Sequence, residues 1–200
     1  MQLQEAVDYL YRIAVVEGKA TSTKRLDGLA QFCVAELARR GLDGAVTEAK
    51  LPGGGREKSW DVAWSLDDKP RLAISLKSLL RNLGGTVPNR VDDLMGEVTN
   101  VQMYSPEIVT GYIMLFNVAE DSYSPAHQST WSDLLKRRIS RLSNRRPPGW
   151  SIGMIEASLF VEVDFSEGPR LVSGEADATP FFDRLVADVR RRNPVLERAP

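Results

Sequence analysis

Apolar residues near the N-terminus recur every three or four positions, which is the spacing of a helix that buries one face. This pattern predicts a helix over residues 3–16, with Val7 and Leu10 among its buried positions. It predicts a second helix from about residue 22 to residue 40, which Gly41 ends. The N-terminal part of the chain is therefore expected to be helical.

The pattern then changes to the alternation of apolar and polar side chains that is typical of β-strands. It predicts a short strand over residues 45–50 and two longer strands over 59–65 and 71–78. The polar, proline-containing segment 66–70 between the longer strands has the length of a hairpin connection. The glycine triplet at 53–55 is expected to form a flexible turn.

Helices and strands alternate in the rest of the chain. The predicted elements are a helix over 90–103 capped by Asn89, a strand over 109–118, a helix over 130–143, a strand over 158–165 and a helix over 181–192. The nearly continuous apolar run 109–118 is typical of a strand that is covered on both faces. This order of elements predicts an α/β fold with a central mixed β-sheet flanked by helices.

The length and composition predict a single domain. A chain of 200 residues with 42% hydrophobic and 26% charged residues can form one hydrophobic core. We expect that core at about residues 45–118, with helices over 1–41 before it and the segment 129–193 after it. No apolar run approaches the roughly 20 residues needed to cross a bilayer, and the first residues lack the pattern of a signal peptide. A cytoplasmic protein without a membrane partner is therefore expected.

The chain has one cysteine and one histidine, which limits the metals that it can hold. Cys33 is expected to be a buried structural thiol, and a single cysteine fits a reducing compartment. With His127 as the only histidine, a zinc site of cysteine and histidine ligands is excluded. Any catalytic metal would be held by oxygen ligands, which favours Mg²⁺ or Mn²⁺.

Lys77 occupies a predicted strand that is otherwise apolar, and an ammonium there needs an acid or an anion to replace its hydration. Because side chains alternate along a strand, Ser75 and Lys77 share one face. Asp61 lies on the preceding strand, on the face opposite its tryptophans. The hairpin is expected to bring Asp61 and Lys77 within about one residue of being cross-strand neighbours. The two residues would form either part of a catalytic site or a plain cross-strand ion pair.

An aspartate and a Ser-x-Lys sequence on adjacent strands, followed by a helix and another strand, resemble the PD-(D/E)xK nuclease superfamily, the fold of many restriction endonucleases. The matching stretch covers about residues 57–118. The resemblance implies a restriction-endonuclease-like core in which Asp61 and a second acid bind Mg²⁺, with Mn²⁺ as a possible substitute. It further implies that Lys77 positions or deprotonates the attacking water.

The chain departs from the family pattern at two positions. Trp60 stands where the family has a proline, a residue that carries no chemistry there. Ser75 stands where most members have an acid, and it resembles a subset of restriction enzymes in which a glutamate on the following helix supplies the carboxylate instead. Glu97 would be that glutamate and would share the metal with the aspartate of the first strand. Asp93 and Glu57 are the alternative acids.

The net charge of −1 gives no general attraction to nucleic acid, so DNA binding would depend on local basic patches. The residues expected to contact DNA are Arg81, Asn89 and Arg90, which flank the proposed site, and Arg137, Arg141 and Arg145, which share a face of the helix predicted after residue 130. On that helix the arginines would either bind backbone phosphates or simply face solvent. A second basic run occupies residues 190–192.

The resemblance implies a magnesium-dependent DNA endonuclease that acts in restriction or phage defence. Cutting both strands needs two active sites, so a homodimer is expected, and a partner protein could direct the cleavage. One alternative is a nuclease-like subunit that has lost catalysis, favoured by Ser75, and serves in DNA binding or assembly. Another is an interaction protein whose basic helix docks an acidic partner.

Overall fold

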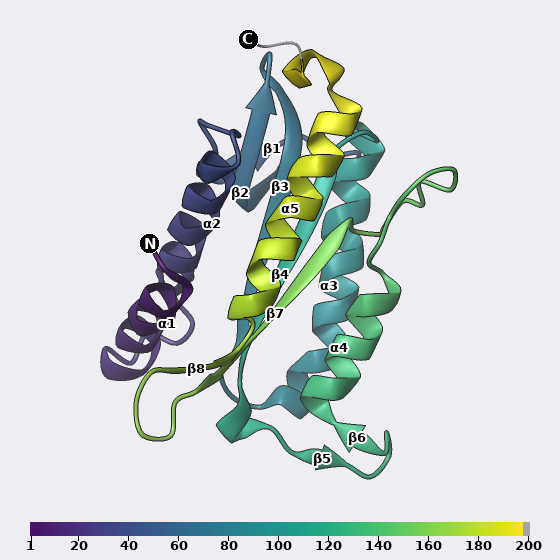
Figure 1. Ribbon diagram of the computed structural model, residues 1–200. Coiled ribbons are helices and arrows are strands. Elements are labelled where there is room, and N and C mark those ends of the chain that lie inside the picture. Colours follow the sequence, from purple (N-terminus) through teal and green to yellow (C-terminus); the bar gives the residue numbers. More distant parts are fainter. Residues whose placement is uncertain (198–200) are drawn as a thin grey trace.

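The computed structural model describes residues 1–197 and contains a mixed six-stranded sheet between two layers of helices (Figure 1). The sheet order is β1-β2-β3-β4-β7-β8. The first three strands are antiparallel, β3, β4 and β7 are parallel, and β8 is antiparallel to β7. The strands are β1 (Val46–Leu51), β2 (Lys58–Leu66), β3 (Lys69–Leu79), β4 (Val109–Asn117), β7 (Ala157–Asp164) and β8 (Arg170–Ser173). The predicted α/β fold with a central mixed sheet flanked by helices is confirmed.

Five α-helices cover the two faces of this sheet within residues 1–197 (Figure 1). One face carries α1 (Leu3–Tyr11), α2 (Asp27–Arg39) and α5 (Glu175–Arg192). The other face carries α3 (Leu83–Tyr104), which connects β3 to β4, and α4 (Trp131–Arg141), which lies between β4 and β7. Shorter elements are the π-helical turn Arg12–Val16, the 3₁₀ turns Thr23–Leu26, Val118–Glu120 and Pro194–Glu197, and a small hairpin of β5 (Tyr123–Ser124) and β6 (Ser129–Thr130). None of the helices in residues 1–197 is long and apolar enough to span a membrane.

Each face of the sheet has its own hydrophobic core, but the prediction that the tryptophans of β2 share a face opposite Asp61 is wrong, because Trp60 packs on the side of α3 and α4 and Trp64 on the side of α1, α2 and α5. Val62 and Ile74 pack on the side of α1, α2 and α5, whereas Ala63 and Ala73 pack on the side of α3 and α4. Strand β4 lies between β3 and β7 and is buried along its whole length, which confirms a strand covered on both faces. At Gly111 in β4 the missing side chain lets α5 approach closely, since a Cβ there would lie 2.8 Å from Leu185 Cδ1.

The hairpin that carries Asp61 and Lys77 forms through a two-residue turn. Asp67 and Asp68 have φ angles of 51° and 57°. Positive φ at both central residues characterises the type I′ turn, whose twist matches that of paired strands. The turn sets the register in which Val62 lies opposite Ile74, with one irregularity between Trp64 and Ser65.

Helix α3 begins earlier than the sequence predicts. It starts at Leu83, and Asn82 caps it by accepting a hydrogen bond from the Gly85 N–H at 3.3 Å. Asn89 is therefore an interior helical residue, and the prediction that it caps the helix is wrong. The glycines and Pro88 suggested a loop, but the buried side chains of Leu83 and Val87 anchor these first turns in the core. Helix α5 likewise begins before the predicted residue 181, and the short strands β5, β6 and β8 were not predicted.

Candidate active site

The candidate site lies where the backbone pairing of β2 with β3 ends, at Val62 and Ile74. Before this pair β2 is irregular, because Trp60 packs on the side of α3 and α4 whereas Val62, two residues later, packs on the side of α1, α2 and α5. The Asp61 carboxylate replaces a main-chain acceptor, because its Oδ2 accepts a hydrogen bond from the Leu76 N–H at 2.7 Å. Asp61 is thereby fixed at the edge of the paired region, at the backbone of Leu76, the residue before Lys77.

Helix α3 brings Glu97 to Ser75 and Lys77 of β3. Glu97 Oε2 accepts a hydrogen bond from Ser75 Oγ at 2.9 Å, and Glu97 Oε1 lies 3.2 Å from Lys77 Nζ. The structure therefore brings together Ser75, Lys77 and Glu97, three of the residues that the sequence singled out. A plain ion pair between Asp61 and Lys77 is not formed, because the ion-pair partner of Lys77 is Glu97.

The two alternative acids are engaged elsewhere. Asp93, which is half-exposed, forms an ion pair with Arg90 at 2.9 Å. The exposed Glu57 lies 3.9 Å from Lys50 on the neighbouring strand. The contacts of Glu97 with Ser75 and Lys77 make it the acid best placed to complement Asp61.

The pKa values of Asp61 and Glu97 are shifted in opposite directions. Burial raises the pKa of Asp61, although Lys77 and the Leu76 N–H oppose this shift. Burial also acts to raise the pKa of Glu97, but Lys77, Lys58 and Ser75 outweigh it, so that the pKa is lowered and the ionised form is favoured. Asp61 has no ion-pair partner within residues 1–197, and a buried carboxylate of this kind is stabilised by a nearby cation.

This donor set suits a hard divalent cation. Two carboxylates and a serine hydroxyl present only oxygen atoms, which Mg²⁺ and Mn²⁺ prefer. The part of the chain described here contains no group of three or more His, Cys, Asp or Glu side chains placed to hold a metal. Mg²⁺ is commonly bound by only one or two carboxylates and keeps several of its waters.

A cavity of about 400 Å³ adjoins Asp61 on the side of α2. Its lining includes Asp27 and Gln31 of α2, Glu48 of β1 and Trp60 of β2. Burial raises the pKa of Asp27, and the charge of Glu48 adds to this shift. The cavity gives the buried Asp61 carboxylate a route to solvent that does not pass α3.

Sequence reasoning missed three residues at the site. Lys58 Nζ donates to Glu97 Oε1 at 2.8 Å, but it precedes the predicted start of its strand. Tyr112 lies beside Ser75 in the parallel register, and it is fully buried with a hydroxyl that has no hydrogen-bond partner; burial and the charge of Glu97 raise its pKa. Arg25 Nε donates to Ser78 Oγ at 3.0 Å, next to Lys77. No local pattern marks these residues, because only the tertiary fold brings them to the site.

Most of the residues predicted to contact DNA are accessible. Arg81 and Asn89 are exposed near the start of α3, and the half-buried Arg90 lies two turns before Glu97 on the same helix. Arg137 and Arg141 are exposed on α4 and make no ion pair within residues 1–197. These positions are compatible with phosphate contacts, and their role stays a prediction.

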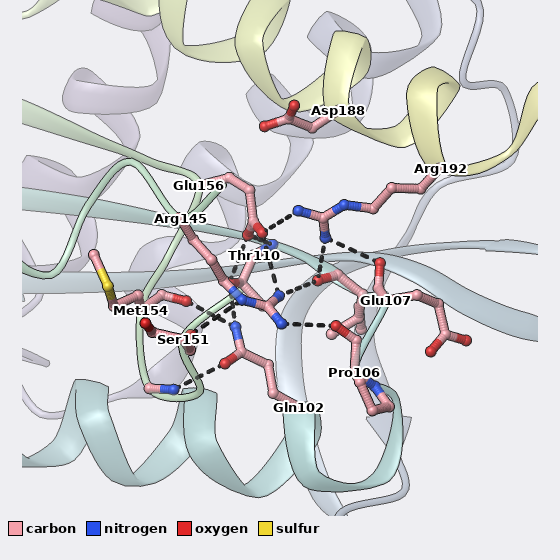
Figure 2. Close-up of polar contacts among 12 residues, drawn as sticks. Gln102, Pro106, Glu107, Thr110, Arg145, Ser151, Met154, Glu156, Asp188 and Arg192 are labelled. Carbon is pink, nitrogen blue, oxygen red and sulfur yellow. Dashed lines mark hydrogen bonds and ion pairs between the residues drawn. The ribbon is translucent and has the colours of Figure 1, made fainter. Parts of the chain in front are cut away.

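The prediction that Arg145 contacts DNA is wrong. It lies beyond the end of α4 and is 2% exposed, so it does not share the exposed face of Arg137 and Arg141. Figure 2 shows its guanidinium enclosed by backbone carbonyls and by Glu156, whose Oε1 lies 3.3 Å from Arg145 Nη1. The chain turns inward after α4, where the Arg145 N–H donates to the Ile155 carbonyl oxygen at 2.9 Å. A buried and paired arginine cannot bind DNA phosphate.

The buried pair belongs to a larger polar network (Figure 2). Glu156 is fully buried and also accepts hydrogen bonds from Arg192 at 2.6 Å and from the Thr110 N–H at 2.6 Å. Arg192 was part of the basic run 190–192 in the sequence, and its neighbour Arg191 forms an ion pair with the buried Asp188. The network joins α5, β4 and the segment before β7, and it is structural.

The chain matches no protein-family model, no curated protein and no solved structure.

Proposed function

We propose that this protein is a magnesium-dependent DNA endonuclease with a restriction-endonuclease-like core. The hydrogen bond between Ser75 and Glu97 is the observation that carries this proposal. It supports an assignment in which Glu97, an acid of the following helix that also lies 3.2 Å from Lys77, supplies the carboxylate that Ser75 cannot. Asp61 on the adjacent strand completes a set of one lysine and two carboxylates.

The order of elements around the site supports the same proposal. Strands β2 and β3 form an antiparallel hairpin, α3 follows, and β4 returns parallel to β3. This is the succession of two strands, a helix and a strand on which the resemblance to the PD-(D/E)xK superfamily rests. In this succession Asp61, Lys77 and Glu97 belong to three consecutive elements, β2, β3 and α3.

In the proposed reaction each side chain has a separate role. Asp61 and Glu97 would hold a divalent cation, which supplies Lewis-acid stabilisation of the scissile phosphate and acidifies bound water. Lys77 would orient the attacking water and assist its deprotonation. Ser75 would keep the Glu97 carboxylate turned toward the site through its hydrogen bond. Arg81, Asn89, Arg90, Arg137 and Arg141 would position the DNA backbone.

The biological setting follows from the resemblance alone. We propose a role in restriction or phage defence, with a homodimer to supply the second active site that double-strand cleavage needs. A partner protein could direct cleavage to its target.

The experiment that tests this proposal measures nicking of supercoiled plasmid by the purified protein. The wild type is expected to nick in Mg²⁺ or Mn²⁺, to stop on chelation with EDTA and to recover when Mg²⁺ is restored. Glu97→Gln is expected to lower the rate at least about tenfold, because it removes a charged ligand. Asp93→Asn and Glu57→Gln serve as matched controls and should nick at the wild-type rate. An equal loss of nicking rate in Glu97→Gln, Asp93→Asn and Glu57→Gln would contradict the proposal. Cleavage that survives EDTA would contradict it as well.

A second candidate is a nuclease-like subunit that binds DNA without cutting it. The observation in its favour is that Glu97 is fully engaged by Ser75, Lys58 and Lys77 in this structure. This candidate predicts cation binding and salt-dependent DNA binding in a protein that nicks no substrate. The plasmid experiment therefore separates it from the endonuclease.

A further inference from the structure

Two lysines share one oxygen of Glu97. Lys58 Nζ lies 2.8 Å and Lys77 Nζ 3.2 Å from Glu97 Oε1. Two ammonium groups this close repel each other, and the single carboxylate oxygen compensates both of them. One of the two lysines can therefore leave Glu97 when another anion binds nearby.

The two lysines differ in how firmly they are held. Lys77 lies within β3, which pairs with β2 on one side and β4 on the other, and its side chain is 21% exposed. Lys58 is the first residue of β2, and its side chain is 32% exposed. The flexible four-carbon stem of Lys58 can turn outward to solvent, whereas Lys77 is held within a strand that is paired with β4.

The segment before Lys58 is docked on the helix that carries Glu97. Asn100, one turn after Glu97, accepts hydrogen bonds from the Gly55 N–H at 2.9 Å and the Arg56 N–H at 3.3 Å, and it donates to the Arg56 carbonyl oxygen at 2.9 Å. A Cβ at Gly53 would lie 2.0 Å from Asn100 Nδ2. The glycine triplet therefore packs closely against α3 and does not form the flexible turn that the sequence predicts. It docks the segment just before Lys58 on the helix that carries Glu97.

We propose that Lys58 is a phosphate-binding residue that leaves Glu97 when DNA binds and thereby opens Glu97 Oε1 to the divalent cation. This inference rests on the proposed function. In the free protein Lys58 and Lys77 both pair with Glu97, and Asp61 forms no ion pair within residues 1–197. A DNA phosphate adds a negative charge at the rim of the site, and Lys58 is the lysine free to move to it. DNA and cation then strengthen each other's binding, because both favour the state in which Lys58 has left Glu97.

The test measures Mn²⁺ affinity without DNA, by the electron paramagnetic resonance signal of free Mn²⁺. Lys58→Met removes the competing ammonium and is expected to tighten Mn²⁺ binding about fivefold or more. In parallel, the affinity for a short fluorescein-labelled duplex is measured in Ca²⁺ over a range of NaCl concentrations. Lys58→Met should lower the slope of log affinity against log salt by about one, the loss of one phosphate contact. Lys50→Met, an exposed lysine on the neighbouring strand β1, is the matched control and should change neither quantity.

Failure of this inference and failure of the proposed function give different results. If Asp61→Asn loses Mn²⁺ binding but Lys58→Met binds it no more tightly than the wild type, the role of Lys58 is overturned and the cation site stands. If the salt slope of Lys58→Met equals that of the wild type, Lys58 is not a phosphate contact. If the wild type and Asp61→Asn bind Mn²⁺ equally, the cation site and the endonuclease are overturned together with this inference.

Discussion

Replacing Lys77 with methionine is expected to lower the kcat of DNA cleavage by about 10²–10⁴-fold, the usual contribution of a positioned general acid or base. Methionine keeps most of the apolar stem and removes only the ammonium that lies 3.2 Å from Glu97. The site retains its two carboxylates and Lys58, so the variant should fold and bind cation and DNA. The loss is therefore expected in kcat, with the affinity for DNA little changed.

This prediction is measured by single-turnover cleavage of a labelled duplex in Mg²⁺, together with the affinity for the same duplex in Ca²⁺. Lys50→Met is the control, because that lysine is exposed on β1 and contacts Glu57 rather than Glu97. A Lys77→Met protein that cleaves at the wild-type rate would exclude Lys77 from the chemistry. A variant that loses DNA affinity while keeping kcat would make Lys77 a binding residue only.

Replacing Glu156 with glutamine is expected to lower the free energy of unfolding by about 3–5 kcal/mol. Glu156 is fully buried and is the shared acid of Arg145 and Arg192, at 3.3 Å and 2.6 Å. Glutamine has nearly the same shape but no charge, so both guanidinium groups would remain buried without compensation. The penalty is large because the low-dielectric interior does not screen these charges.

Urea unfolding followed by tryptophan fluorescence measures this effect. The matched control is Glu107→Gln, since the exposed Glu107 side chain contacts Arg71 at 3.1 Å and such surface pairs contribute about 0–1 kcal/mol. An equal loss of unfolding free energy in the two variants would mean that the network in Figure 2 contributes no more to stability than a surface ion pair does.

The sequence predicted those parts of the fold that depend on local patterns. The alternation in β3 assigned Ser75 and Lys77 to one face, and the polar segment 66–70 marked the connection of the hairpin, which the structure closes with the shorter turn at Asp67 and Asp68. The spacing of apolar residues in α3 placed Glu97 at the border of its buried face, where it meets Ser75. The strand period, the residue types of a turn and the helical period can each be recognised within about ten residues of sequence.

The parts that could not be predicted depend on contacts between distant segments. The first turns of α3 contain glycines and Pro88, and only the packing of Leu83 and Val87 against the rest of the core makes them helical. Arg145 has the helical spacing of an exposed arginine, but its environment is set by Glu156 and by the carbonyl oxygens of residues 106 and 108. Lys58 is an ordinary surface lysine until α3 places Glu97 beside it.

The most direct test of the cation site is a crystal of the protein soaked in Mn²⁺ and measured for anomalous scattering. The account predicts an anomalous peak within bonding distance of carboxylate oxygens of both Asp61 and Glu97, with Lys58 displaced from Glu97 Oε1. A map in which Glu97 keeps both lysines and any Mn²⁺ peak lies away from Asp61 would contradict it.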